Sequence, residues 1–315
     1  MSVAASLDRP RRRCRYTFAA NVADATVCAI AYRPAMTTEA APRTPARSAH
    51  RVLEPIHTLV YFVPEAGERY VAAGLKGGMR GYFASRSAPL GVVPVEVVIA
   101  TFYNFAPAMV RKAIPSAWQD TTPEAILAAR LDAADAAITR LLGDEIKSDE
   151  MAEAAALARE ATSAADIVGR PLYAAHAALP WPEPPHLQLW HAATLLREHR
   201  GDGHIAALLL AGLSGGEAVV SYLATGKSMP EDLLRSTRGY EEDEWAALKQ
   251  QLRDKGIFTD DDQFTPRGQE QRHEIEARTD AAAAAPYDHL GPERTERLTE
   301  LVRPWARSVT KQIFG

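Results

Sequence analysis

The residues best suited to chemistry lie between positions 196 and 204, in the string LREHRGDGH. This string places two histidines, an aspartate and two arginines around a pair of glycines. We predict that Gly201 ends one helix and that Asp202 caps the next. Such a junction can hold His204 as a general base beside Asp202, because a neutral imidazole accepts protons near pH 7.

The same residues also have a purely structural interpretation, in which Asp202 only caps a helix and its neighbours satisfy backbone carbonyls. His191 lies eight positions before His199, about two helical turns, so both fall roughly on one face. A metal or haem site built from these neutral histidines is a further functional interpretation. The spacing lacks the i, i+4 histidine pair of an HExxH zinc site, so we predict no metal and no cofactor. We favour the structural interpretation and keep contact with a small molecule as the functional alternative. Its candidate residues are His191, Arg200, Asp202 and His204.

A second group of candidates surrounds the apolar run TFYNF at 101–105. Its aromatic rings, together with the Asn104 amide and Arg86, can line an apolar pocket with a few orienting polar groups. Core packing is the simpler interpretation of this pattern. The site hypothesis is a joint pocket that combines Arg86, Tyr103 and Asn104 with the His204 junction and binds an unidentified small molecule.

Several kinds of site are missing from the sequence. It has no phosphate-binding glycine loop with lysine, no nucleophile elbow and no dinucleotide fingerprint, so it gives no support to an ATPase or a Rossmann oxidoreductase. Whether any reaction is catalysed stays open. Cys14 and Cys28 are the two cysteines, so the folded body offers no disulfide framework and no thiolate metal site. No run of about 18 apolar residues occurs, which predicts a cytoplasmic protein without a membrane span.

The first fifty residues differ from the rest in charge. Residues 1–50 hold eight arginines and three acidic residues, whereas the whole chain has a formal net charge of −4. We predict that this segment is disordered or is a mis-assigned start, with translation beginning at Met1 or at Met36. The alternative is a disordered basic arm that touches nucleic acid.

Helical patterns fill most of the remaining sequence. Thr122, for example, precedes Pro123 as the N-cap of a helix with an apolar stripe. We predict a mostly α protein whose helical N-terminal domain covers 51–179. Four prolines in the six residues 180–185 mark a linker, and residues 186–315 form a second domain.

The second domain carries a pattern of helix, hairpin and helix. The amphipathic helix 241–255 is followed by a short strand at Ile257–Thr259, a turn at 260–263 and a return strand at Phe264. Thr265 then caps a new helix. The pattern predicts a winged helix-turn-helix domain whose wing is a short β-hairpin.

The segment from Leu252 to Gly268 resembles the wing region of MarR-type regulators, which pair Leu-x-x-Lys-Gly-Ile with Leu-Thr-x-x-Gly. Phenylalanine at 264 replaces the second leucine here. More broadly, residues 53–280 resemble the SalK-like family of helix-turn-helix proteins from GC-rich bacteria. That resemblance rests on LEPIHTLVYF, RSAPLG, ATFYNFAP, LWHAATLLREHRGDGHIAAL and the wing segment. It implies the fold and brings little about activity.

The MarR-like resemblance also implies a homodimer and a DNA contact. The last helix, with its apolar stripe from Leu298 to Ile313, is the candidate dimer interface. The helix before the wing would enter the major groove. The residues implied to contact DNA are Arg235, Arg238, Lys249, Gln250 and Arg253.

Charge disfavours this DNA contact. From 230 to 256 there are seven acidic and five basic residues, and the predicted wing tip is a triple aspartate at 260–262. Acidic side chains at both places repel phosphate. The first hypothesis is a ligand-responsive winged-helix regulator or small-molecule-binding protein. The alternative is an enzyme or biosynthetic accessory protein that has kept the scaffold and no longer binds DNA.

Overall fold

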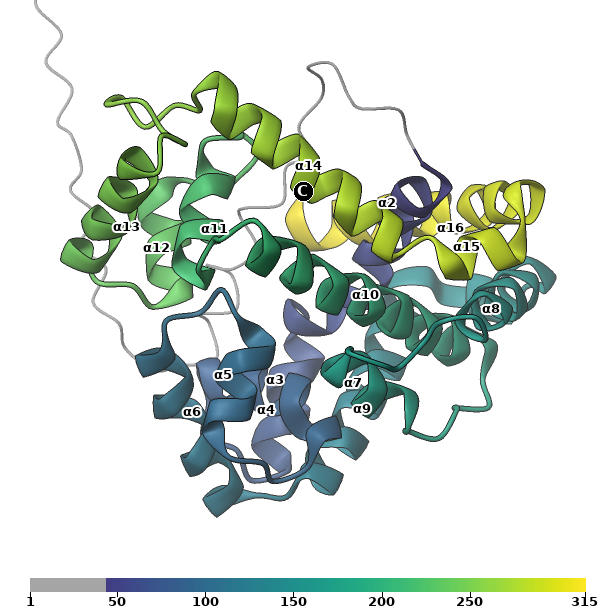
Figure 1. Ribbon diagram of the computed structural model, residues 1–315. Coiled ribbons are helices and arrows are strands. Elements are labelled where there is room, and N and C mark those ends of the chain that lie inside the picture. The colour runs from purple at the N-terminus through teal and green to yellow at the C-terminus, as the bar shows by residue number, and fades with distance from the viewer. Residues whose placement is uncertain (1–43) are drawn as a thin grey trace, which may run out of the picture.

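The structure, a computed structural model, describes residues 44–315 (Figure 1). These residues form fifteen α-helices, three short 3-10 helices and one isolated β-bridge, so the mostly helical fold is confirmed. The α-helices are α2 (Pro45–Thr58), α3 (Pro64–Ala72), α4 (Met79–Ser87), α5 (Val95–Phe102), α6 (Pro107–Asp120), α7 (Pro123–Leu142), α8 (Asp149–Thr162), α9 (Pro171–Ala177), α10 (Pro185–Leu210), α11 (Gly215–Leu223), α12 (Glu231–Arg238), α13 (Glu242–Asp254), α14 (Pro266–Ala282), α15 (Ala285–Leu290) and α16 (Pro292–Phe314). The 3-10 helices are η2 (Leu59–Tyr61), η3 (Ala88–Leu90) and η4 (Gly143–Lys147).

Side-chain caps fix where several of these helices begin. Thr122 accepts a hydrogen bond from the N–H of the third residue of α7 at 3.2 Å, and Pro123 opens that helix. Ser214 starts α11 with a capping box, in which Glu217 accepts from the backbone N–H of Ser214 in return. A cap of this kind stabilises a helix by about 1 kcal/mol. The caps predicted at Thr122 and Thr265 are confirmed.

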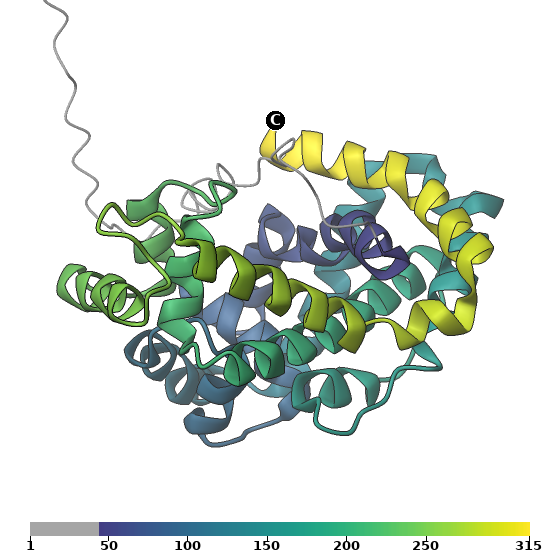
Figure 2. The ribbon, with the colours of Figure 1, turned by 45° about the horizontal axis from the view of Figure 1, so that its top comes forward.

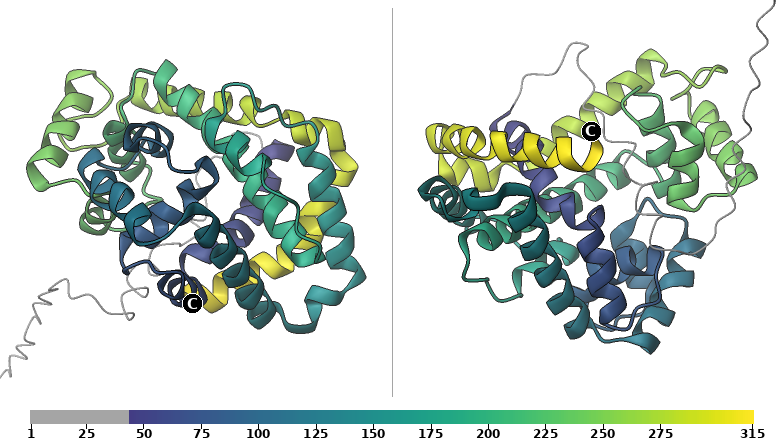
Figure 3. Two further views of the ribbon diagram at one scale, coloured as in Figure 1. Left: turned by 90° about the horizontal axis from the view of Figure 1, so that it is seen from below. Right: turned by 180° about the vertical axis from the view of Figure 1, so that it is seen from behind.

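Helix α10 crosses the middle of the molecule (Figure 1). α2, α7, α8 and α9 pack against it, and α16 covers α2 and α8. α14 runs side by side with α10, as Figure 2 shows. α11, α12 and α13 lie together at one end of the molecule, and Figure 3 shows this end again from below and from behind. α10 therefore connects the body of the protein to that end.

Three hydrophobic clusters form the interior of residues 44–315. The largest takes residues from both sides of the proline-rich segment 180–185, since Ile126 and Met151 share it with Leu189 and Leu298. A second lies among α4, α5 and α6, and a third joins the end of α10 to α11–α14. The division at 180–185 stays a prediction about folding units, and the chain on both sides of it shares one core.

α10 continues through the junction that the sequence predicted at Gly201. The helix runs unbroken from Pro185 to Leu210, so Gly201 does not end it and Asp202 does not start a new one. A glycine inside a helix costs about 1 kcal/mol relative to alanine, and burial of α10 among its neighbours outweighs that cost. Asp202 caps a different helix, because its carboxylate accepts from the N–H of Tyr173 in the first turn of α9 at 2.9 Å.

The predicted β-hairpin wing is not present in residues 44–315. The turn after α13 contains one antiparallel bridge, between Phe258 and Phe264. The N–H groups of Ile257 and Phe258 both donate to the Leu252 carbonyl, at 2.9 and 3.2 Å, and so terminate α13. Because these two N–H groups donate to the end of α13, they do not form β-sheet hydrogen bonds with the chain that returns after the turn. Thr265 then starts α14, which leaves no room for a second strand.

The structure corrects two predictions, one at each end of the chain. α2 begins at Pro45, so residues 45–50 are helical and not part of an irregular first fifty. The choice between Met1 and Met36 lies outside the described residues. The stripe on α16 that was predicted to form a dimer is covered by this chain itself, with Leu298 0% and Trp305 5% exposed. The homodimer stays a prediction, but the apolar stripe of α16 is not available as its interface.

No single helix in residues 44–315 is long and apolar enough to cross a membrane. Two pairs of helices pass the same test of length and composition only when joined, and both are sharply bent, by 101° and 97°.

Candidate functional site

Five α-helices and η2 bring polar side chains together within the largest core. α10 supplies one side of this group, because Trp190, Thr194 and Glu198 are spaced four residues apart and lie on one helical face. α2, α4, α7 and α9 supply the others. We name the group the central polar cluster. Its members are His57, Tyr61, Tyr82, Arg86, Arg130, His176, Trp190, Thr194 and Glu198.

Arg86 of α4 is an ion-paired member of the cluster. It is 6% exposed, its Nη2 donates to both oxygens of Glu198 at 3.3 Å, and its Nη1 donates to the Tyr82 hydroxyl at 2.9 Å. Burial acts to lower the pKa of Arg86, but Tyr82 and Glu198 outweigh it and raise that pKa. Burial likewise acts to raise the pKa of Glu198, but Arg197 and Arg86 hold it well below its usual range. Both groups are therefore charged at neutral pH.

Arg130 of α7 is buried as deeply but has no acidic partner. It is 2% exposed, and it forms no ion pair with any carboxylate of the described chain. Its Nη1 donates to Nε2 of His176 at 3.2 Å, and its Nη2 donates to the Tyr61 hydroxyl at 3.3 Å. The guanidinium lies over the ring of Trp190, 5.0 Å from its centroid, a contact worth about 0.5–2 kcal/mol. Since a guanidinium stays protonated in proteins, a positive charge is buried here with only neutral contacts.

His176 of α9 is a neutral acceptor for this guanidinium. Because Nε2 accepts from Arg130, the ring proton is on Nδ1, which donates to the Leu172 carbonyl at 3.0 Å. Burial, and then the charge of Arg130, lower the pKa of His176 to about 3. The ring therefore stays uncharged throughout the neutral pH range.

His57 of α2 has the opposite arrangement, with a free acceptor atom. Thr194 donates its single hydroxyl proton to the Trp190 carbonyl at 2.9 Å, so it must accept from Nδ1 of His57 at 3.0 Å. The proton of His57 is therefore on Nδ1, and Nε2 carries a lone pair. Burial, and then Arg197, hold the pKa of His57 well below its usual value.

Four polar atoms of the cluster have no hydrogen-bond partner among residues 44–315. Three are donors, namely Nε of Arg86, Nε of Arg130 and Nε1 of Trp190, and the fourth is the acceptor Nε2 of His57. Buried polar atoms of native proteins nearly always have a partner. Two guanidiniums and the carboxylate of Glu198 also leave one positive charge uncompensated. The cluster is therefore equipped to bind a small polar anion.

Arg86 is the one residue of the seven predicted ligand contacts that belongs to this cluster. His191 lies on α10 but packs edge-on against Trp181, with ring centroids 4.7 Å apart. Burial lowers the pKa of His191 to about 4. Asp202 serves as the cap of α9, and burial raises its pKa to about 6.

Arg200 and His204 connect α10 to α14. Arg200 donates to Asp280 at 3.3 Å, and Nδ1 of His204 donates to the Thr279 hydroxyl at 2.8 Å, whose own proton goes to a backbone carbonyl. Burial lowers the pKa of His204 to about 4. These contacts hold the two helices side by side.

Tyr103 and Asn104 lie where the body meets α11. Tyr103 has a φ of 45°, uncommon for a residue with a side chain, and its hydroxyl donates to the Leu213 carbonyl. The backbone of Gly215 comes so close that a Cβ there would lie 1.8 Å from the Tyr103 carbonyl oxygen. These contacts anchor α11 to the body. The joint pocket of Asn104 with His204 stays a prediction.

Sequence reasoning missed Arg130 and Glu198. On α7 the apolar side chain of Leu131 is 37% exposed, whereas the charged side chain of Arg130 beside it is buried. The available signal was spacing, since Arg130 lies four residues after Ile126 and four before Ala134, both fully buried. Glu198 stands in the same way within the buried face of α10. A charged residue inside an apolar stripe is the pattern that marks such positions.

α12 and α13 form a second feature, a pair of helices joined by three residues. The first of these, Gly239, has a φ of 77°, which the tight turn requires. Leu234, Trp245 and Leu252 bury their side chains between these helices and α11. Trp245 also donates from Nε1 to Glu231 at 2.7 Å and so joins α13 to α12. The geometry is that of a helix-turn-helix.

A model of the helix-turn-helix family matches residues 46–314. The chain belongs to the helix-turn-helix family. The match covers the helical body as well as α12 and α13, so the whole described fold belongs to the family pattern. No curated protein and no solved structure gives a significant match. Family membership is consistent with a DNA-binding regulator, and the finer SalK-like resemblance stays a prediction.

In this helix-turn-helix protein the cations of α13 are paired with acidic neighbours. Lys249 contacts both Glu231 and Asp262, the latter at 3.1 Å, and its side chain is 17% exposed. Arg253 contacts Asp262 at 2.5 Å. Asp262 comes from the turn that replaces the predicted wing, and its backbone is left-handed, with a φ of 59°. Two of the predicted DNA contacts are thus neutralised from within the chain.

The other three predicted DNA contacts also have intramolecular partners. Gln250 is exposed and donates to a carboxylate one turn further along α13 at 2.8 Å. Arg235 donates to the Tyr240 carbonyl at 3.4 Å. Arg238 lies over the ring of Phe105, 4.9 Å from its centroid, and so contacts the body of the protein.

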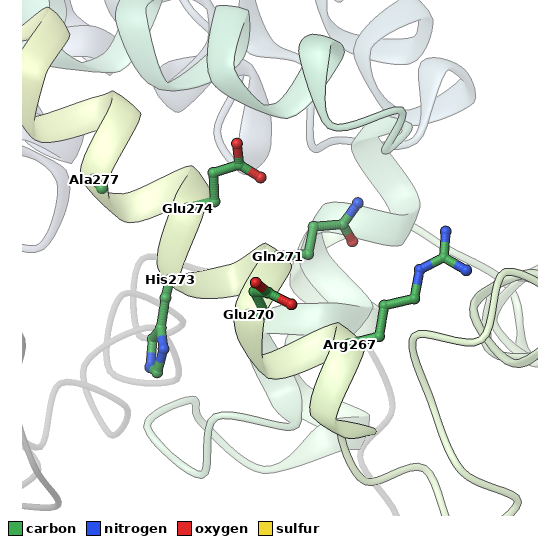
Figure 4. A pocket seen from close by; sticks show the side chains of 6 residues that line it. All are labelled: Arg267, Glu270, Gln271, His273, Glu274 and Ala277. Carbon is green, nitrogen blue, oxygen red and sulfur yellow. The ribbon is translucent and has the colours of Figure 1, made fainter.

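A hollow along α14 is the other surface feature that bears on binding (Figure 4). All its lining residues come from this one helix, and their side chains spread apart without enclosing a space. No three histidine, cysteine or acidic side chains gather for a metal ion in the part of the chain that the structure describes, and the absence of a metal stays a prediction. The lining residues are Arg267, Glu270, Gln271, His273, Glu274 and Ala277.

Proposed function

We propose that this helix-turn-helix protein is a ligand-responsive regulator that binds a small molecule in the central polar cluster. The observation that carries the proposal is Arg130, a buried guanidinium with only neutral contacts. A buried charge without a partner costs several kcal/mol, so a bound counter-charge stabilises the folded state. The unpartnered atoms of Arg86, Trp190 and His57 support the same site.

α10 offers a direct route from this site to the helix-turn-helix unit. Its 26 residues span about 39 Å. Trp190 and Glu198 belong to the cluster, whereas Ala207 and Leu208 pack in the core of α11–α14. A helix packed at both ends carries a small displacement from one to the other. A ligand that shifts α10 therefore changes how α13 is presented.

Nucleic acid is the partner that the family and the unit's geometry favour. α13 is the helix that would enter the major groove. Its exposed face carries Gln250 and Gln251, whose amides can hydrogen-bond to adenine. The acidic start of α13 at Glu241–Glu244 keeps nonspecific affinity low, because such affinity depends on Lys and Arg that neutralise phosphates.

A second candidate is a small-molecule-binding protein, such as an enzyme or biosynthetic accessory protein, that does not bind DNA. The observation that favours it is Asp262, which neutralises both Lys249 and Arg253. The two candidates share the central polar cluster and differ in what the helix-turn-helix unit contacts.

Two measurements on the full chain test the proposal. Native mass spectrometry detects a co-purified small molecule, and fluorescence anisotropy with pooled genomic fragments at low and moderate salt detects DNA binding. A retained molecule, together with salt-sensitive and sequence-selective DNA binding that changes on its removal, supports the regulator. A retained molecule without DNA binding at low salt supports the second candidate. No retained molecule and no ligand-induced rise in Tm overturn both.

A further inference from the structure

We infer that the molecule bound by the central polar cluster is a small organic carboxylate that carries a hydroxyl group. The inference rests on the proposed function and goes further by assigning the ligand's chemical class. Three observations carry it: the charge of the cluster, the side chains on which its unpartnered donors lie, and its single unpartnered acceptor.

The charge of the cluster selects an anion. Arg86, Arg130 and Glu198 are its charged members, and its two histidines are neutral. Arg197 and Glu54 stand at its edge and add one charge of each sign, with side chains 28% and 20% exposed. One positive charge is left over, and Arg130 is the member without a carboxylate. A carboxylate suits this position because it accepts two parallel N–H bonds from a guanidinium.

The unpartnered donors lie on the same side chains that bury this charge. Nε of Arg130 and Nε1 of Trp190 both lack an acceptor within residues 44–315, and the guanidinium lies over the Trp190 ring. Nη1 and Nη2 already donate to His176 and Tyr61, which fixes the plane of the guanidinium. A carboxylate has two oxygens, one for each of these two donors. An amide group, with its single oxygen and no charge, leaves one donor unsatisfied.

The unpartnered acceptor selects a hydroxyl group on the ligand. Nε2 of His57 presents a lone pair, and the ring of His57 is 5.4 Å from that of Tyr61, which contacts Arg130. A ligand hydroxyl donates to this atom while the carboxylate binds at Arg130. A ligand without the hydroxyl leaves Nε2 unsatisfied and binds about tenfold more weakly.

The aromatic side chains of the cluster limit the size of the ligand. The rings of Tyr61 and Tyr82 are 5.2 Å apart, and the guanidinium of Arg86 lies 4.5 Å from the centroid of the Phe102 ring. These side chains are in contact with one another. A ligand therefore enters only where these side chains move apart, and a small ligand requires the least movement.

Three probes of matched shape test the inference by thermal unfolding of the full chain. Lactate has both groups, propionate lacks the hydroxyl, and lactamide lacks the charge. Lactate is expected to raise Tm by about 2 °C or more at saturation. Propionate is expected to act at about tenfold higher concentration, and lactamide to have no effect.

Matched variants locate the site. Arg130→Met removes the unpaired charge, keeps much of the side-chain volume and is expected to fold, because an apolar replacement of a buried charge is tolerated. It is expected to abolish the lactate shift. Arg159→Met is the control, since Arg159 also lies over a tryptophan, Trp181 at 4.6 Å, but is exposed. If Arg130→Met does not fold, Trp190→Phe removes one donor and is expected to weaken lactate binding about tenfold.

The outcomes separate this inference from the function beneath it. Equal shifts with lactate and lactamide overturn the carboxylate, and equal shifts with lactate and propionate overturn the hydroxyl, while the proposed function stands. A lactate shift that survives Arg130→Met, or that sodium chloride reproduces, also overturns the inference. No shift with any probe, and no co-purified molecule, overturn the proposed function itself.

Discussion

Arg86 and Arg130 show that one residue type has two energetic roles in the same core. Both are at most 6% exposed. Arg86 neutralises Glu198, whereas Arg130 has only neutral contacts. Removing one partner of a buried pair leaves the other charge uncompensated. Removing the unpaired charge leaves no charge behind, and its cost is limited to the hydrogen bond that Nε2 of His176 loses. The same substitution at the two positions should therefore have opposite effects on stability.

Arg86→Met is expected to lower the free energy of unfolding by about 3 kcal/mol, at the low end for a broken buried pair because Arg197 still contacts Glu198 at 2.7 Å. Arg130→Met is expected to leave it unchanged or raise it. Urea unfolding of both variants measures the difference. The double variant Arg86→Met with Glu198→Met should recover most of the loss. No recovery would mean that Arg86 stabilises the core through its ring contacts instead.

At the scale of elements, the turn between α13 and α14 controls the charge of α13. Asp262 in this turn accepts from both Lys249 and Arg253. Its backbone is left-handed, with a φ of 59°, a conformation that asparagine also tolerates. Asp262→Asn therefore removes the acidic group and keeps the turn.

Asp262→Asn is expected to strengthen binding to DNA fragments, because Lys249 and Arg253 become available to phosphates. Each added phosphate contact makes the slope of log affinity against log salt more negative by about 0.9. Fluorescence anisotropy over a salt series measures both effects. Asp261→Asn is the matched control, since it changes the net charge equally and Asp261 is exposed. Equal gains in the two variants would show that general charge, and not release of the two cations, is responsible.

Two glycines of α10 should respond in opposite ways to alanine. A Cβ at Gly203 would lie 2.9 Å from Cβ of Ala282, so α10 and α14 would have to separate, and Gly203→Ala is expected to destabilise the protein by about 1–3 kcal/mol. At Gly201 the nearest atoms are 3.6 Å away and belong to side chains. Gly201→Ala is expected to stabilise by about 0.5–1 kcal/mol. Thermal and urea unfolding measure the stability of both variants. Equal changes in the free energy of unfolding would contradict the close approach of α10 and α14 at Gly203.

At the scale of the whole molecule, buried histidines set the response to acid. His57, His176, His191 and His199 are at most 5% exposed. Burial lowers the pKa of His176 to about 3 and those of His191 and His199 to about 4. In the unfolded chain these groups titrate near 6.5, so the unfolded state binds more protons between about pH 4 and 6.5. Their contribution to stability is complete above that window and is lost as pH falls through it.

The free energy of unfolding is therefore expected to be level above about pH 7 and to fall toward pH 5, by up to about 5 kcal/mol per pH unit from the four histidines. Asp202 has the opposite effect, because its pKa is raised to about 6 and the folded state therefore binds one more proton than the unfolded state there. It reduces this slope by up to one proton. Urea unfolding from pH 5 to 8 measures the profile. His176→Gln should reduce the slope by one proton, and the exposed His273→Gln should not. A flat profile would contradict the neutral burial of these rings.

Local features of this fold were predictable from the sequence, and features set by distant contacts were not. The caps at Thr122 and Thr265 depend on neighbouring residues, and both are confirmed. The predicted wing was wrong because the N–H of Ile257 donates to the Leu252 carbonyl at the end of α13 and not across the turn. In the central polar cluster, His57 and Thr194 are bonded across 137 positions, a pairing that no local pattern reveals.

Because α10 serves two interiors, the helix-turn-helix unit is not a transferable module. Leu189 near one end of α10 packs in the largest core, and Leu208 near the other end packs against α11–α14. If α11–α14 are transferred to another protein without α10, their hydrophobic core loses the side chains that α10 contributes. A graft that takes α10 along brings the buried face with Trp190 and Glu198 into water. Chimeras that exchange target specificity would therefore have to replace single side chains on α13 and leave the backbone in place.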